Sequence, residues 1–114
     1  MTQQARIAAL QTQIGGPRDG ALLRYALARA LLEAGHKQPA ISALREALQF
    51  DAGYSAAWKD LGRVLHQCGD SEAAAEAFRK GIAVAEKRGD VQAAKEMRVF
   101  LRRIERETAA GRTD

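Results

Sequence analysis

Apolar side chains recur every three or four residues along most of this chain, which is the spacing of one face of an α-helix. The pattern predicts an all-α fold of about six helices, separated by residues that end helices. These breaks fall at Gly15, Gly16, Pro17, Gly35, Gly69 and Gly89. Residues suited to helix starts precede several of the apolar stripes: Thr2, Asp19, Ser55, Asp70 and Asp90.

The middle of the chain repeats itself at a distance of 34 residues. Residues 21–54 align with residues 55–88 with seven identities, and this period is typical of helix-turn-helix repeats. Small residues in matching places allow two helix axes to approach, and large residues fill the space beside them. We expect the repeat core to comprise Leu27, Ala28, Leu31, Ala40, Leu44, Trp58, Leu61, Gly62, Leu65, Ala74 and Phe78.

The second unit carries a recognisable motif. Its residues are Trp58-x2-Leu61-Gly62-x2-Leu65, then Gly69-Asp70, Ala74, Phe78 and Gly81. This motif resembles the tetratricopeptide repeat signature, and the first unit resembles a degenerate copy of it. The resemblance implies a short right-handed α-solenoid that forms one domain over residues 1–114. Its expected parts are an N-terminal helix in 1–16, repeats in 21–54 and 55–88, a capping helix in 89–108 and a disordered tail in 109–114.

Composition narrows the class of protein. Aromatic residues make up only 5% of the chain, which argues against a β-sandwich. Cys68 is the only cysteine and cannot form an internal disulfide, which favours a reducing compartment. The N-terminus lacks the apolar run of a signal peptide, and the most apolar stretch, residues 21–34, is too charged and too short to span a membrane. We therefore expect a soluble, cytoplasmic domain without a membrane partner.

The net charge of +4 raises the question of nucleic-acid binding. The excess is spread evenly, because each of the segments 1–20, 21–54, 55–88 and 89–114 has one more basic than acidic residue. Proteins that bind phosphates usually concentrate their positive charge on one face, and those that bind single strands interleave aromatic residues with it. Nucleic acid is therefore not an expected partner.

The sequence shows no arrangement typical of catalysis. Cys68 and His66 lie two residues apart on a helix, so their side chains point in nearly opposite directions. We expect a buried or half-buried thiol and a surface histidine. Neither His36 nor His66 has further ligands at metal-binding spacing, and no glycine-rich phosphate loop is present. The sequence predicts no enzyme activity, metal or cofactor.

The resemblance implies a protein-interaction module. In this family the first helix of each repeat lines a concave groove that binds partner segments. The corresponding groove residues would be Tyr25, Arg29, Lys59, Arg63 and His66. The two arginines and the lysine can hold a carboxylate, so the expected partner is a protein or peptide with acidic groups. The alternative is a solvated face of mixed charge, because Asp60 and Glu33 lie nearby.

The last predicted helix offers a second candidate surface. Lys95, Arg98, Arg102 and Arg106 form a basic stripe that can contact phosphates, acidic partners or a membrane surface. The alternative is a capping helix with a solvated outer face, because three glutamates dilute this charge. An exposed apolar edge at Val99 and Phe100 would favour self-association. A self-assembling homo-oligomer joined through the terminal helices is therefore the alternative function.

Overall fold

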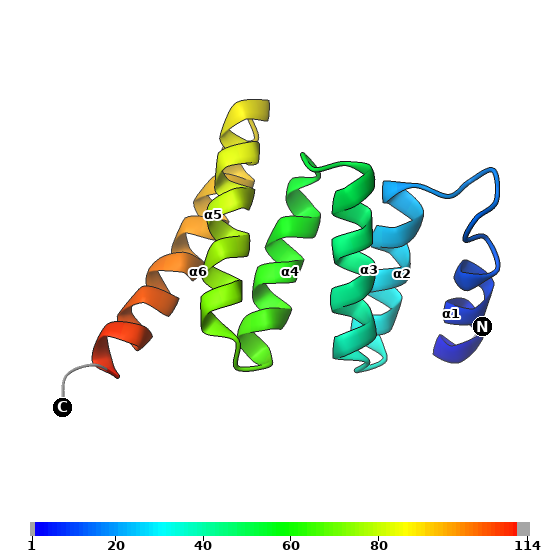
Figure 1. The fold of residues 1–114 in the computed structure, drawn as a ribbon, viewed down its shortest axis with the longest axis horizontal. Helices are drawn as coiled ribbons and strands as arrows, with labels where there is room; N and C mark the ends of the chain where they lie inside the picture. Colours follow the sequence, from blue (N-terminus) through cyan, green and yellow to red (C-terminus); the bar gives the residue numbers. More distant parts are fainter. Residues whose placement is uncertain (1, 112–114) are drawn as a thin grey trace.

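The computed structural model describes residues 2–111, which form six α-helices that run alternately up and down (Figure 1). The helices are α1 (Gln3–Gln11), α2 (Ala21–Glu33), α3 (Lys37–Phe50), α4 (Ser55–Gln67), α5 (Ser71–Arg88) and α6 (Val91–Ala110). They follow one another along the longest dimension of a molecule that measures 50 × 31 × 20 Å, with α2 behind α3 in the view of Figure 1. Residues 2–111 contain no β-strand. The expected all-α class and the helical repeat solenoid are confirmed.

Three helices begin at predicted capping residues. The carboxylates of Asp70 and Asp90 accept hydrogen bonds from the backbone N–H groups of Ala73 and Ala93, at 3.1 and 3.2 Å. The Thr2 hydroxyl caps α1 in the same way. Each bond satisfies a backbone donor that has no partner inside the helix.

Two other predicted capping residues do not cap a helix. α2 begins two residues after Asp19, whose carboxylate instead accepts a hydrogen bond from the Arg24 side chain at 2.8 Å. Ser55 is the first residue of α4, and its hydroxyl donates to the Asp90 carboxylate at 3.0 Å. The Asp19 carboxylate also accepts from the backbone N–H of Gly15 at 2.9 Å, so it closes the loop before α2 and does not cap the helix. The N-terminal helix occupies only part of the expected segment 1–16, since it ends at Gln11.

The core lies where the helices of each pair face one another. Its largest buried side chains include Phe78, Leu44, Leu61 and Met97. Phe78 lies so close to α4 that a Cβ atom at Gly62 would stand 2.6 Å from the ring, so only glycine fits there without a shift. Among the expected core positions, Trp58 alone is only partly buried, and its indole N–H donates to the Ala52 carbonyl at 2.7 Å.

α6 occupies the place of the first helix of a third pair, because it packs against both α5 and α4. It starts 36 residues after α4, whereas α4 starts 34 residues after α2. The offset arises because α5, with 18 residues, is longer than α3, with 14, while the turn after it is shorter. α6 continues to Ala110, so residues 109 and 110 are helical and do not belong to a disordered tail. Residues 112–114 of that expected tail lie outside the described residues.

Candidate protein-binding face

α4 contacts α2 on one side and α6 on the other through side chains that recur at equivalent positions. Tyr25, the fifth residue of α2, donates its hydroxyl to Asp60, the sixth residue of α4, at 2.7 Å. Lys59, the fifth residue of α4, pairs with Glu96, the sixth residue of α6, at 3.5 Å. The same contact, from the fifth residue of one helix to an acidic sixth residue of the other, thus occurs twice along the stack of helices. α2, α4 and α6 are therefore equivalent helices, and together they form one face of the molecule.

Asp60 is the one buried charged side chain among residues 2–111, with 6% of its surface exposed. Besides the Tyr25 hydroxyl, its Oδ2 atom accepts a hydrogen bond from Arg29 at 3.4 Å. Burial, together with the bond to Asp60, raises the pKa of Tyr25 above its usual value. Because an unpaired buried carboxylate is costly, these two partners hold α2 against α4.

Two other expected groove residues, His66 and Arg63, contact α6. His66 Nε2 lies 2.9 Å from Glu107 Oε2. The Arg63 guanidinium carbon lies 5.2 Å from the ring centroid of Phe100, which in turn stacks on Phe78. Arg63 is exposed and has no ion-pair partner within residues 2–111. Of the five expected groove residues, Arg63 therefore keeps its full charge available to a ligand.

A shallow hollow of about 280 Å³ lies where α2, the start of α3 and α4 meet. It is lined by Arg29, Leu32, Lys37, Asp60, Arg63, Val64 and Gln67. Three of these side chains are cationic and one is a carboxylate. The structure thus brings Arg29 and Arg63 to one hollow, whereas Tyr25, Lys59 and His66 do not line it and instead join neighbouring helices.

Lys37 is a member of this hollow that sequence reasoning missed. It is the first residue of α3, and the resemblance assigned the groove to the first helix of each repeat alone. The turn at Gly35, where φ is +82°, folds the chain back so that the start of α3 lies beside the end of α2. The sequence could have indicated this role, because Lys37 lies only two residues after the predicted break at Gly35.

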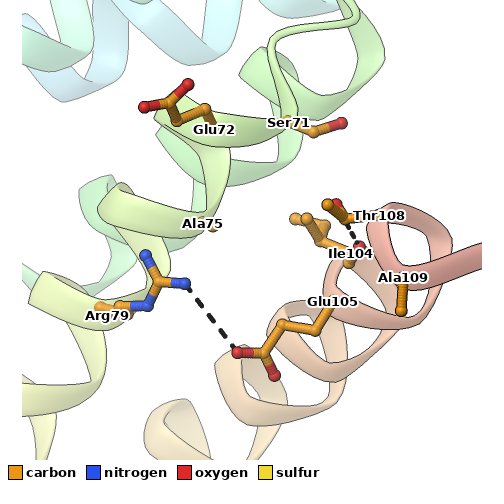
Figure 2. Close-up of a pocket in the computed structure, with 8 residues that line it drawn as sticks. All are labelled: Ser71, Glu72, Ala75, Arg79, Ile104, Glu105, Thr108 and Ala109. Carbon is orange, nitrogen blue, oxygen red and sulfur yellow. Dashed lines mark hydrogen bonds and ion pairs between the residues drawn. The ribbon is translucent and has the colours of Figure 1, made fainter. Parts of the chain in front are cut away.

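A second hollow, of about 610 Å³, lies between the first half of α5 and the last turns of α6 (Figure 2). Its inner wall is formed by Ala75 and Ile104, and an ion pair between Arg79 and Glu105 at 3.9 Å spans it. The Thr108 hydroxyl donates to the Ile104 carbonyl at 2.9 Å. Arg79 is the one cation that lines this hollow, and it is paired with Glu105, whereas the hollow beside Arg63 has two cations without an ion-pair partner within residues 2–111.

Other features of residues 2–111 concern metal binding, membrane crossing and the cysteine thiol. No group of three or more His, Cys, Asp or Glu side chains there is placed to hold a metal ion. None of the helices in this range combines the length and the apolar character needed to cross a bilayer. Cys68 is exposed at the end of α4, contrary to the expectation of a buried or half-buried thiol, because α4 ends there and the thiol lies at its C-cap.

Known proteins resemble this chain in sequence. A family model described as tetratricopeptide repeat matches residues 1–85. The TPR repeat-containing protein PA0015 of Pseudomonas aeruginosa is 43% identical over 88 residues, which cover 77% of this chain and 84% of that protein.

Solved structures extend the likeness to the fold. The solution structure of protein BPP2914 from Bordetella parapertussis is 41% identical with a TM-score of 0.78, over 91% of this chain and 90% of that one. A tetratricopeptide repeat domain protein from Salinibacter ruber is 25% identical with a TM-score of 0.72, over 78% of this chain and 89% of that one. Sequence, repeat length and fold agree, and the chain belongs to the tetratricopeptide repeat family.

Proposed function

We propose that the hollow between α2 and α4 binds an acidic segment of a partner protein and holds it without catalysing a reaction. Tetratricopeptide repeat domains generally mediate protein–protein interactions and are generally non-catalytic. The finer proposal concerns where the partner binds on this chain and which chemistry it brings.

The observation that carries the proposal is the imbalance of charge around the hollow. Arg29, Lys37 and Arg63 border it, and Asp60 is its only carboxylate. The Oδ2 atom of that carboxylate already accepts hydrogen bonds from Tyr25 and Arg29. The positive potential of the hollow therefore attracts an external anion.

The hollow also favours a carboxylate that has an apolar neighbour. A guanidinium presents five N–H donors, of which Arg29 uses one on Asp60, so both arginines retain donors for two-point bonds to a carboxylate. Leu32 and Val64 supply an apolar surface between them. We therefore expect an acidic residue of the partner to lie between Arg29 and Arg63, with an apolar side chain beside it.

A double variant, Lys37→Glu with Arg63→Gln, tests this proposal. Both side chains are exposed and neither forms an ion pair within residues 2–111, so the fold should persist. Lys59→Glu is less suitable, because it would place like charges together at Glu96. The matched control is Arg45→Glu with Arg18→Gln, which changes the net charge by the same amount at exposed positions outside the hollow.

The wild type and both variants are used to capture proteins from native cell extract, and each retained protein is then titrated by calorimetry. We expect a partner that the wild type and the control variant retain. The hollow variant should bind it about tenfold more weakly or worse, because hydrogen bonds to charged groups contribute roughly 1.5–3 kcal/mol. Equal binding by the hollow variant would contradict the proposal.

A further inference from the structure

The carboxylates of α6 all turn toward other helices. They pair as follows: Glu96 with Lys59, Glu107 with His66, and Glu105 with Arg79. Each glutamate stays about half-exposed, but its carboxylate pairs with a side chain of a neighbouring helix and not with the cations on the solvent-facing side of α6. The sequence pattern, in which the same glutamates dilute the basic stripe, therefore underestimates how positive that side is.

The side of α6 that faces neither α4 nor α5 is a continuous stripe of valines and cations. This outer stripe consists of Val91, Lys95, Val99, Arg102 and Arg106, which lie on one helical face. The two valines are 64% and 52% exposed, and none of the three cations forms an ion pair within residues 2–111. Arg98, the fourth member of the sequence-predicted stripe, pairs instead with Glu86 of α5.

The repeated contact between equivalent helices indicates what this stripe fits. At each step in the stack, the fifth residue of one helix binds an acidic sixth residue of the next: Tyr25 binds Asp60, and Lys59 binds Glu96. The fifth residue of α6 is Lys95, and no further helix of this kind exists within residues 2–111. Lys95 therefore corresponds to Tyr25 and Lys59, each of which binds a carboxylate of a neighbouring helix, but Lys95 has no such partner within residues 2–111.

We propose that the outer stripe of α6 docks an acidic, amphipathic helix of a partner protein, in the place where the next equivalent helix of a longer stack would lie. Carboxylates of the partner helix pair with Lys95, Arg102 and Arg106. Its apolar residues cover the two exposed valines. This site is separate from the hollow between α2 and α4 and does not depend on it.

Charge selects this occupant over a second copy of the chain stacked end to end. Such stacking would bring the outer stripe against α1, which contains Arg6 and no acidic residue. The apolar part of the stripe consists of valines without an exposed aromatic side chain, which suits a helix better than the stacking of unpaired bases or the anchoring of a helix in a membrane interface.

The test uses a synthetic peptide of Glu, Leu and Ala, about 20 residues long to match α6, with Glu and Leu along one helical face. A companion peptide carries Gln in place of every Glu. Fluorescence anisotropy measures the binding of both peptides to the full chain and to three variants. The stripe variant is Lys95→Glu with Arg102→Glu, the hollow variant is Lys37→Glu with Arg63→Gln, and the control is Arg18→Glu with Arg45→Glu.

We expect the Glu peptide to bind the wild type, the control and the hollow variant alike, and the stripe variant about tenfold more weakly. Salt of about 1 M, where the Debye length is about 3 Å, should weaken binding to the wild type. No binding of the Glu peptide, or equal binding of the Gln peptide, would overturn the proposal.

Two further outcomes separate this proposal from neighbouring ones. Loss of the Glu peptide from the hollow variant, with binding retained by the stripe variant, would place the acidic peptide in the hollow and overturn the stripe proposal while supporting the proposed function. Tighter binding of phosphatidylserine vesicles or of a single-stranded RNA than of the Glu peptide would also overturn it, in favour of a membrane or nucleic acid.

Discussion

At Asp60, one buried carboxylate joins the two repeats. Its partners come from α2, and it lies on α4 itself. Asp60 lies on an expected groove face, but because it is buried and bonded to α2, it joins two helices and offers no free carboxylate to a ligand. The free charge of the hollow comes from Lys37 and Arg63, which have no carboxylate partner within residues 2–111.

The first prediction concerns the hydroxyl of Tyr25. Tyr25→Phe leaves the Asp60 carboxylate without its shortest hydrogen bond, so we expect the free energy of unfolding to fall by about 1–3 kcal/mol. Urea titration followed by circular dichroism measures this loss. Tyr54→Phe is the control, because the Tyr54 ring packs against Tyr25 at 4.9 Å but its hydroxyl has no hydrogen-bond partner within residues 2–111. Equal losses in the two variants would contradict the assigned role of the Tyr25–Asp60 bond.

The second prediction concerns the close approach at Gly62. A methyl group there would stand 2.6 Å from the Phe78 ring, so Gly62→Ala should lower the free energy of unfolding by about 1–3 kcal/mol through overpacking, despite the better helix propensity of alanine. Gly62→Ala should cost less stability in a Phe78→Leu background than in the wild type, because the smaller leucine leaves room for the methyl group. Denaturant titration of the four proteins in this cycle checks the coupling, and strict additivity of the two losses would show that the contact is not the cause.

At the scale of elements, the loop between α1 and α2 is fixed by charge. Arg24 of α2 binds the Asp19 carboxylate at 2.8 Å and the Glu46 carboxylate of α3 at 2.7 Å, and its guanidinium lies 5.6 Å from the Phe50 ring centroid. The hydrogen bond from Arg24, together with the backbone N–H of Gly15, holds the pKa of Asp19 well below its usual value. The loop therefore depends on an ionised Asp19.

The third prediction follows from that shift. Because the pKa of Asp19 is lower in the folded than in the unfolded chain, its contribution to stability is complete above about pH 4 and is lost as the pH falls through the folded pKa. Asp19→Asn should be less stable than the wild type at neutral pH, and this difference should shrink as the solution is acidified. Thermal unfolding across the acidic range measures it, and a constant difference would contradict the role of the ionised carboxylate.

The sequence predicted regular elements better than it predicted their partners. The 34-residue period, the glycine breaks and the caps at Asp70 and Asp90 are local features that show directly in the chain. The last helix was expected in 89–108, close to where α6 lies, but its equivalence to α2 and α4 was hidden because the longer α5 shifts the frame by two residues. The roles of Asp60 and Lys37 were hidden because each depends on which neighbouring helix its side chain meets, and no local pattern encodes that.

At the scale of the whole molecule, α6 both completes the core and ends the stack. Ala94, Met97 and Ile104 are almost fully buried on it, and Phe100 covers Phe78. The stability of a solenoid is the sum of its repeats and the interfaces between them, and two repeats provide few such interfaces. The interface with the last helix therefore contributes a large part of the total stability.

The fourth prediction is that a chain ending at Gly89 loses most of its helical structure. Removing α6 uncovers Phe78 and deletes several buried apolar side chains, each worth about 1.5–3 kcal/mol, against a total stability of about 5–15 kcal/mol for a typical domain. Circular dichroism should show a large loss of helix signal and no cooperative transition. A truncated chain that melts like the full one would mean that α6 does not belong to the core.

The central claim is that a partner protein binds at the hollow between α2 and α4. Photo-crosslinking in the native cell tests it most directly, with a photoreactive amino acid placed at Gln67, which lines the hollow. The control places the same group at Gln49, an exposed position on α3 outside the hollow. We predict that one protein crosslinks through position 67 and not through position 49, and that Lys37→Glu with Arg63→Gln abolishes this crosslink. A partner that crosslinks through position 49 alone, or equally through both positions, would contradict the account.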